Sequence, residues 1–510
     1  MKKGVFQLRT RKTSFLRYFY SALLITFLLT GCSLSTFQRD ETLNQKAFNI
    51  SIMTTSFTNN PATENSSVVK ALEEYTNTKL NINWVSNTAY NDKMNLALAS
   101  GTLPNIMLIT SKTSSVISAA RSDAFWDLKS YLQSYGNLRL ANQTSLNNIS
   151  IDNTIYGIPR MRYPGRYGIV YRKDWLNNVG MSEPKNIDDF YNMLKAFTQK
   201  DPDKNGKKDT YGLILSMSDI SFDIIQSWFG VPNVWGEDSN GKLIPAHMTS
   251  AYKESLKFLR KLYSEKLVNQ DFTIFNTSRW NDPFVNGEGG CIIDVVDRAN
   301  TLSSRLDRAG DSNSAIDVIG SVAGPEGLKN LSTSGNAGFY AISKSSVKTE
   351  DDLKRVLDFM DKLNDKKIQD LLYYGIEGRH YIVDNGNVIR KTSDGVSESE
   401  WNDLSMLLTF IPKDYTAPVQ MTPLREKVMK VQDENEKIIV QNPAESITSD
   451  IYTQKGDILD NMISQARLKY VIGEIDEEAL DNIFKAWLDK GGNDYINEIN
   501  TKYSNLKSKK

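Results

Sequence analysis

The sequence predicts an α/β protein in which strands alternate with helices along most of the chain. Short apolar runs such as Phe48–Met53 and Ile106–Ile109 have the length and composition of buried strands. The segments between them carry apolar residues at helical spacings of three and four. Strands that alternate with helices favour a parallel sheet covered on both faces. The 510 residues include 40% hydrophobic residues, which is typical of a folded chain of two to four domains.

The first elements follow from periodicity and from stop signals. Val68, Val69 and Leu72 lie on one helical face, and Gly101 is a C-terminal stop for a second helix. The resulting order is strand Phe48–Met53, helix Ser66–Lys79, strand Ile82–Val85, helix Tyr90–Ser100 and strand Ile106–Ile109.

A second α/β stretch begins after Pro159 and ends in a helical tail. Its helix Ile187–Gln199 places Phe190, Leu194 and Phe197 on one face. The predicted strands are Tyr167–Tyr171, Tyr211–Leu215, Gly289–Val295 and Gly338–Ile342, and the predicted tail helices are Leu424–Val440, Ile451–Gln465 and Glu477–Lys490.

The N-terminus carries the pattern of a secretion signal. Residues 1–31 contain six basic residues and no acidic one, and their apolar run Tyr18–Leu29 is shorter than a membrane-spanning helix. The run ends in Leu-Thr-Gly before Cys32, which resembles a bacterial lipobox, whose cysteine becomes lipid-modified. We therefore expect a signal peptide over 1–31, a tether over 32–47, and a protein held by lipid on the extracellular face of the cell membrane, as on a Gram-positive surface. The alternative is an ordinary signal peptide with a chance cysteine.

Composition argues against several classes of function. The 61 basic and 61 acidic residues balance, so nucleic acid is not an expected partner. Only two cysteines and two histidines are present, which excludes zinc sites built from Cys and His clusters. Among catalytic classes, a glycoside hydrolase with two carboxylates is the strongest alternative, because Asp294, Asp297 and Glu377 could supply an acid and a base.

Residues 201–209 have the spacing of a calcium-binding loop. Side-chain oxygens occupy positions 1, 3, 5 and 9, glycine occupies position 6, and a backbone carbonyl is available at position 7. The usual glutamate at position 12 is replaced by Gly212. The alternative is a solvated turn. The candidate ligands of a structural Ca²⁺ are Asp201, Asp203, Asn205, Lys207 through its backbone, and Asp209.

Several motifs together resemble the family 1 extracellular solute-binding lipoproteins, in particular their large oligosaccharide-binding branch, which includes alginate-binding proteins. They are Leu103–Ile106, Tyr171–Trp175, the aspartate loop with Thr210–Gly212, Trp228–Trp235 and Gly375–Tyr381. The resemblance implies a monomeric two-lobed clamp with a cleft at the hinge. The clamp would deliver an oligosaccharide, or alternatively a peptide, unchanged to the permease subunits of an ABC importer. By analogy, the first lobe would comprise 48–158 plus 294–340 and the second 159–293 plus 341–510, with crossings near Pro159–Tyr167, Ile293–Asp297 and Gly338–Ser343.

Candidate ligand contacts are aromatic platforms for sugar faces and charged groups near the proposed crossings. Each aromatic candidate has a competing role in the core, and each charged one a competing role in a solvated or structural ion pair. The aromatic candidates are Trp228, Trp235 and Trp280. The polar candidates are Arg160, Arg162, Tyr163, Arg166, Asp294, Asp297, Arg298 and Glu377, with Arg379 and His380 as weaker ones.

Overall fold

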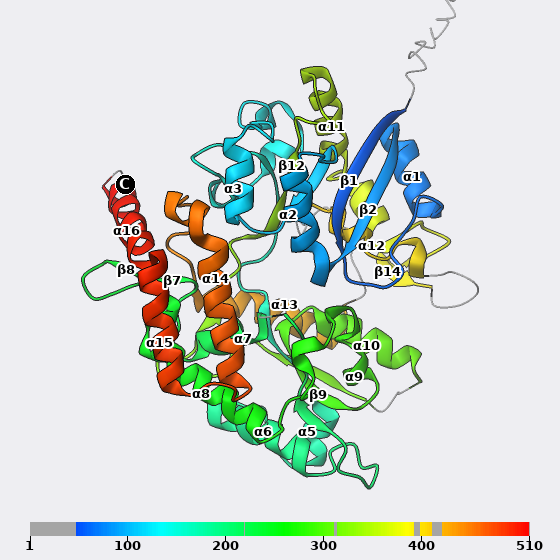
Figure 1. Ribbon diagram of the computed structural model, residues 1–510. Coiled ribbons are helices and arrows are strands. Elements are labelled where there is room, and N and C mark those ends of the chain that lie inside the picture. Colours follow the sequence, from blue (N-terminus) through cyan, green and yellow to red (C-terminus); the bar gives the residue numbers. More distant parts are fainter. Residues whose placement is uncertain (1–46, 219, 311–313, 392–397, 411–420, 509–510) are drawn as a thin grey trace, which may run out of the picture. The chain divides into compact units, whose positions relative to one another are not determined.

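The computed structural model describes residues 47–218, 220–310, 314–391, 398–410 and 421–508 (Figure 1). The predicted signal peptide, Cys32 and nearly all of the predicted tether lie outside the described residues. Two central sheets, each with its own hydrophobic core, define a first and a second lobe. The chain is a mixed α/β protein, as the sequence predicts.

The first lobe is built on a five-stranded sheet in the order β2-β1-β3-β12-β4. Strands β1, β2 and β3 are parallel, whereas β12 runs antiparallel to both β3 and β4. The sheet is therefore mixed, which corrects the expectation of a parallel sheet. Its strands are β1 (Phe48–Ser56), β2 (Thr78–Ser86), β3 (Ile106–Ile109), β4 (Gly157–Met161) and β12 (Asn336–Ile342).

Helices from both halves of the chain cover this first sheet. Ser66 caps α1 by accepting from the N–H groups of Val68 and Val69, and Asn77 ends the helix in the left-handed conformation. Apolar faces of α1, α3 and α11 enter one core with the strands. The helices are α1 (Ser67–Thr76), α2 (Tyr90–Ser100), α3 (Ser114–Arg121), α4 (Gln143–Ile149), α11 (Glu350–Lys362) and α12 (Lys366–Tyr374).

The second lobe is built on a four-stranded sheet in the order β10-β5-β9-β6. Strand β5 lies antiparallel to β9 and β10, and β6 is parallel to β9. The strands are β5 (Tyr167–Arg172), β6 (Tyr211–Leu213), β9 (Gly289–Val295) and β10 (Ile316–Ile319). The helices are α5 (Lys173–Asn178), α6 (Ile187–Gln199), α7 (Ile220–Trp228), α8 (Ser250–Ser264), α9 (Asp282–Val285), α10 (Arg298–Arg308) and α13 (Pro423–Asn435).

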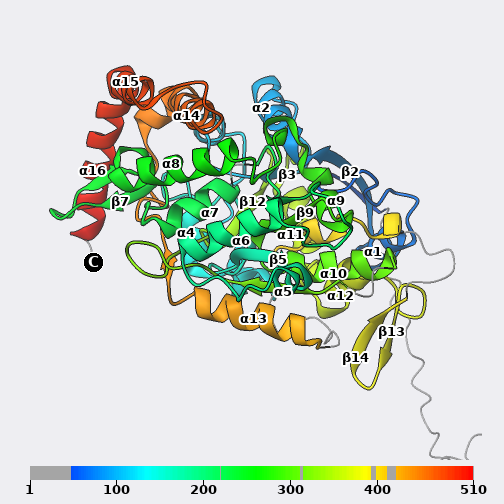
Figure 2. The same ribbon diagram turned by 90° about the horizontal axis from the view of Figure 1, so that it is seen from below.

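Minor sheets and three C-terminal helices complete the described part. The small strands are β7 (Trp235–Glu237) with β8 (Leu243–Pro245), β11 (Asn330–Leu331) with β15 (Ile439–Val440), and β13 (Tyr381–Asp384) with β14 (Asn387–Arg390). The last helices are α14 (Asp450–Val471), α15 (Glu477–Trp487) and α16 (Asn493–Lys507) (Figure 2). No described helix has both the length and the apolar composition that crossing a membrane requires.

Helix α14 packs against both lobes. Tyr452 near its start lies against the core of the first lobe, whereas Ala466 and Tyr470 belong to a core of the second lobe. The two lobes therefore share this helix in addition to the chain crossings between their sheets.

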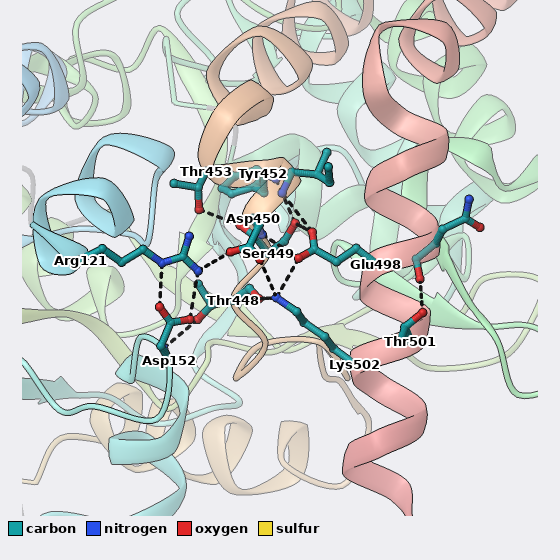
Figure 3. A network of polar contacts seen from close by, with 12 residues as sticks. Arg121, Asp152, Thr448, Ser449, Asp450, Tyr452, Thr453, Glu498, Thr501 and Lys502 are labelled. Carbon is teal, nitrogen blue, oxygen red and sulfur yellow. Dashed lines mark hydrogen bonds and ion pairs between the residues drawn. The ribbon is translucent and has the colours of Figure 1, made fainter.

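Polar contacts fix the start of α14 (Figure 3). Arg121 of α3 pairs with Asp450, with 2.6 Å between Nη2 and Oδ1, and with Asp152, with 2.7 Å between Nε and Oδ2. Glu498 of α16 accepts hydrogen bonds from the N–H groups of Asp450 and Ile451 at 2.8 and 3.0 Å. The first lobe, α14 and α16 are thus joined at one point.

The chain is divided between the lobes differently from the expected boundaries. Residues 298–310 and 314–319 pack on the second sheet, because β10 pairs with β5 in the register Ile316↔Arg172. Residues 350–391 and 398–410 supply helices and apolar side chains to the first core, although 341–510 was expected in the second lobe. The first crossing, at 162–166, lies within the expected Pro159–Tyr167 segment. The chain returns to the first sheet between β11 and β12.

Candidate functional site

A cavity of about 2010 Å³ lies between the two lobes. Thr58, Trp401 and Asp403 line it from the first lobe, and Arg308 and Arg425 line it from the second. The segment that crosses between β4 and β5 contributes another part of the wall. The volume exceeds the range of roughly 300–1,000 Å³ that is usual for a small-molecule site, so the cavity has room for a ligand of several sugar units.

The end of β4 and the crossing segment after it carry four of the predicted residues, and three of them reach the cavity. Arg162, Tyr163 and Arg166 line the wall. Arg160 lies behind it, with only 4% of its surface exposed. Its Nε and Nη1 donate to the carbonyls of Met406 and Ala337, each at 3.1 Å. Arg160 therefore holds the segments around the cavity together and does not face it.

The two arginines on the wall differ in their partners. Arg166 Nη2 lies 3.2 Å from Asp297 Oδ1. Burial opposes ionisation of Asp297, but the charge of Arg166 outweighs it, so the pKa of this carboxyl is below its ordinary value. Arg162 donates from Nη1 only to the carbonyl of Met161, at 2.6 Å, among the described contacts. Burial and the neighbouring cations of Arg160 and Arg166 lower the pKa of Arg162 well below the ordinary value.

The three predicted tryptophans are core residues, and none lines the cavity. Trp228 is 0% exposed and packs edge-on against Phe190, with 5.3 Å between ring centroids. Trp235 packs in the same way against Tyr495 at 5.1 Å. Trp280 is buried and donates from Nε1 to the carbonyl of Ile214 at 3.0 Å. The prediction that these three tryptophans stack on sugar rings is therefore wrong. A turn beside a tryptophan in the sequence does not indicate which element covers the side chain in the fold.

The two acidic candidates near the second predicted crossing, Asp294 and Asp297, have different surroundings. Asp294 is 8% exposed and pairs with Arg298, whose Nε donates to Oδ2 at 2.9 Å. Arg298 also donates to Asn281 and lies over the ring of Trp280, so this pair is structural. Asp297 alone reaches the cavity.

The Gly375–Tyr381 turn also lies off the cavity. Glu377 is exposed and is not part of the cavity wall. Arg379 pairs with Glu400 at 2.6 Å. His380 is buried, and its Nδ1 accepts from the N–H of Ile376 at 2.7 Å. These residues hold the turn against the 398–401 segment.

The aspartate loop folds with its oxygens turned toward its own amides. Asp201 accepts from the N–H groups of Asn205 and Gly206 at 3.0 and 2.9 Å. The side-chain amide of Asn205 donates to Asp203 at 2.7 Å and to Asp209 at 3.2 Å. The three carboxylates thus accept from backbone and side-chain N–H groups of the loop itself. Over the described residues, no group of three or more His, Cys, Asp or Glu is spaced to hold a metal ion.

The comparison with known protein families decides the class of protein. The model of the bacterial extracellular solute-binding protein family matches residues 54–370. The chain belongs to this family. Lipoprotein LipO of Bacillus subtilis is 40% identical over 95% of this chain and 97% of its own length. The polygalacturonan/rhamnogalacturonan-binding protein YtcQ of the same organism is 37% identical over 86% of this chain and 88% of its own length.

Solved structures show the same two-lobed fold. The alginate-binding protein AlgQ2, solved without calcium ion, matches with a TM-score of 0.68 and 20% identity over 90% of this chain and 98% of that one. The Streptococcus pneumoniae protein FusA in complex with kestose matches with a TM-score of 0.66 and 18% identity over 91% and 100%. This solute-binding protein is therefore not an enzyme, because its family is one of extracellular solute-binding proteins. The alternative that the chain is a glycoside hydrolase is therefore excluded.

Sequence reasoning found Tyr163 but missed other aromatic side chains on the wall of this solute-binding protein. Tyr373, Tyr374 and Trp401 line the cavity at the end of α12 and in the 398–407 segment. The guanidinium of Arg390 lies over the rings of Tyr374 and Trp401, at 5.6 and 5.7 Å from their centroids. The paired tyrosines directly before Gly375 are the only sequence signal that could have drawn attention to this corner.

Proposed function

We propose that this chain is the substrate-binding subunit of an ABC importer and that it captures extracellular oligosaccharides. The observation that carries the proposal is the cavity of about 2010 Å³ between the lobes, whose wall combines aromatic and charged side chains. Aromatic rings stack on the apolar faces of sugar rings, and charged groups bind their polar substituents. The relative YtcQ and the solved structures of AlgQ2 and of FusA with kestose support the same class of solute, because each is described as binding a saccharide.

The mechanism follows from contacts on both lobes. A ligand that touches Trp401 of the first lobe and Arg425 of the second stabilises the arrangement in which the two approach each other. Closure then requires only that the ligand binds the closed arrangement more tightly than the open one. The permease would read the closed form, and the ligand is released without chemical change.

The test is a thermal-shift screen of the full chain, purified in detergent, against oligosaccharides and oligopeptides. A ligand that binds only the native state raises the melting temperature, by an amount that grows with its concentration. We expect stabilisation by oligosaccharides that are recovered uncleaved. Stabilisation by peptides alone would contradict the sugar assignment.

We also propose that Cys32 anchors the chain to the membrane by lipid. The lipobox pattern supports this, and the B. subtilis relative LipO is named a lipoprotein. Two acyl chains suffice for stable anchoring without a spanning helix. Cys32→Ser should move the protein from the membrane fraction to the soluble fraction when cells are fractionated. Retention of the variant in the membrane fraction would refute the anchor, and Cys291→Ser is the control, since that thiol is buried in the second core.

We propose, finally, that the 201–209 loop binds a structural Ca²⁺ through Asp201, Asp203, Asn205, Asp209 and the carbonyl of Lys207. Three carboxylates close to Asn205 support this: Asp201 accepts from its backbone N–H, and Asp203 and Asp209 accept from its side-chain amide. A cation could take the place of these N–H donors. Added Ca²⁺ should raise the melting temperature by several degrees, and a chelator should reverse the rise. Asp203→Ala should abolish the response. An Asp188→Ala control, in the first turn of α6, should keep it. If the melting temperatures of the two variants responded equally to Ca²⁺, the proposed calcium site would be contradicted.

A further inference from the structure

The arginines between the end of β4 and the start of β5 use their N–H donors in different ways. Arg160 donates from Nε and Nη1 to two backbone carbonyls. Arg166 donates from Nη2 to both carboxylate oxygens of Asp297, at 3.2 and 3.3 Å. Arg162 makes one hydrogen bond among the described contacts, from Nη1 to the carbonyl of Met161 at 2.6 Å, and it pairs with no carboxylate of the described chain. A guanidinium is a planar fork of several N–H donors, so most of the donors of Arg162 are available to a ligand.

Backbone contacts hold Arg162 in the wall of the cavity. Its N–H donates to the carbonyl of Gly335 at 3.0 Å, and the N–H of Thr333 donates to the carbonyl of Pro164 at 3.0 Å. Ser145 of α4 donates from Oγ to the same carbonyl of Gly335, at 3.3 Å. All of these residues line the cavity. The position of Arg162 is therefore fixed through its main chain and does not depend on its guanidinium.

The surroundings of Arg162 oppose its positive charge. Burial lowers the pKa of this guanidinium, and the cations of Arg160 and Arg166 lower it further. The carboxylate of Asp297 acts in the opposite direction, but it already pairs with Arg166. A partly buried cation without a carboxylate of its own costs free energy, and an anionic ligand would offset that cost.

We propose that Arg162 binds a carboxylate of an acidic oligosaccharide and so makes the cavity selective for anionic sugars. This inference rests on the proposed function and names its substrate class. Arginine binds a carboxylate through two parallel, charge-assisted hydrogen bonds, and the donors on Nε and Nη2 of Arg162 have no partner among the described contacts. Arg160 lies behind the wall and Arg166 holds Asp297, so neither competes for this part.

Arg162 lies where polar side chains of both lobes reach the cavity. Helix α4 of the first lobe contributes Thr144 and Asn148 to the wall, and α10 of the second lobe contributes Asn300 and Thr301. Hydroxyl and amide groups can exchange hydrogen bonds with the hydroxyl groups of a sugar. A saccharide anchored by its carboxylate at Arg162 can therefore contact both lobes at the point where the chain crosses between them.

The first experiment compares two ligands of the same length that differ in charge. Trigalacturonate and its fully methyl-esterified form are titrated by calorimetry into the full chain in detergent, at pH 7 and low salt. The acid should bind at least about tenfold more tightly, since the ester cannot form charge-assisted hydrogen bonds. Equal affinities, or tighter binding of the ester, would overturn the role of Arg162 and leave the oligosaccharide function standing. If no oligosaccharide, acidic or neutral, binds, both proposals fail.

Two further ligands separate the sources of negative charge. Sulfated galactotriose carries its charge on sulfate esters, and triglutamate carries carboxylates on a peptide. Weaker binding of both than of trigalacturonate supports a sugar carboxylate as the group that Arg162 binds. Preference for either one over trigalacturonate would overturn that assignment.

The second experiment changes the charge of the wall. Arg162→Gln should weaken binding of trigalacturonate about tenfold and change binding of the ester little, so that the preference for the acid is lost. Arg139→Gln is the matched control, because Arg139 also donates to a nearby carbonyl, that of Gly136 at 3.2 Å, but is exposed and does not line the cavity. This control should keep the preference of the parent, and an unchanged preference in Arg162→Gln would contradict the proposal.

A conservative variant distinguishes charge from shape. Arg162→Lys keeps the positive charge but loses the planar fork, so its affinity for trigalacturonate should lie between those of the parent and of Arg162→Gln. A loss as large as that of Arg162→Gln would show that the charge at this position does not attract the ligand, and would overturn the proposal.

Stability without ligand separates a ligand-binding arginine from a structural one. Arg162→Gln breaks no ion pair of the described chain and only the hydrogen bond to Met161, so the melting temperature of the ligand-free variant should be unchanged or higher. A lower melting temperature together with equal losses of affinity for acid and ester would mean that Arg162 supports the wall and does not bind the ligand. That result would overturn the proposal.

Discussion

The interior of the second lobe and the wall of the cleft use their large side chains in opposite ways. Trp228 and Trp280 are enclosed by apolar neighbours, and their contribution is packing. Arg390 and Trp401 on the wall leave aromatic and charged surface facing an open cavity. Residue type alone therefore does not identify a binding site in this protein. Tryptophan occurs in both regions, and only its surroundings distinguish a packing role from a ligand-binding role.

Trp228→Ala tests whether this tryptophan contributes to stability and not to ligand binding. The side chain is fully buried against Phe190, so its removal should lower the free energy of unfolding by about 3–5 kcal/mol. Chemical denaturation of the full chain measures the loss. Affinity for an oligosaccharide, measured on the folded fraction, should remain that of the parent.

Trp401→Ala provides the matched variant on the wall. This side chain is half-buried beside Arg390 and should affect ligand affinity more than unfolding free energy. If Trp228→Ala weakened binding and Trp401→Ala did not, the assignment of core and wall would be reversed.

A smaller effect separates two arginines that are only two positions apart. Arg160→Met should lower the free energy of unfolding by about 1–3 kcal/mol, because the buried carbonyls of Ala337 and Met406 lose their donors. Arg162→Met should change it less, since this guanidinium bonds only the adjacent carbonyl of Met161 among the described contacts. Thermal or urea unfolding of both variants measures the difference.

Ligand binding should show the reverse order for the same pair. Arg162 lines the cavity and Arg160 does not, so Arg162→Met should weaken the binding of acidic oligosaccharides more. Equal effects of the two substitutions on both stability and affinity would remove the distinction between structural and cavity-facing arginines.

Local periodicity predicts much of the fold. The helices Tyr90–Ser100 and Ile187–Gln199 and the strands Ile106–Ile109 and Gly289–Val295 have the predicted bounds, because each carries its own apolar pattern and end signal. The pairing of strands is not local. The pairing of β10 with β5 depends on contacts between distant segments, and so does the packing of residues 350–391 and 398–410 on the first core. Such contacts leave no periodic pattern in the sequence.

The cleft is harder to predict for the same reason. Arg162, Tyr163 and Arg166 could be found because they cluster beside Pro164 and Gly165 at a crossing. Arg308, Arg390 and Arg425 come from three separate elements, and only the folded chain places them on the wall of one cavity. A tryptophan beside a turn has the same sequence appearance whether it is covered or exposed, so Trp228, Trp235 and Trp280 could not be placed by pattern alone.

The contact between Glu498 and the first turn of α14 makes a helix that packs on both lobes depend on a distant segment. A helix start needs partners for its free N–H groups, and here two of them are supplied by a carboxylate 48 and 47 positions further along the chain. Loss of α16 would leave these two N–H groups without their carboxylate acceptor. Because α14 packs on both cores, a change in α16 can reach both lobes through this one helix.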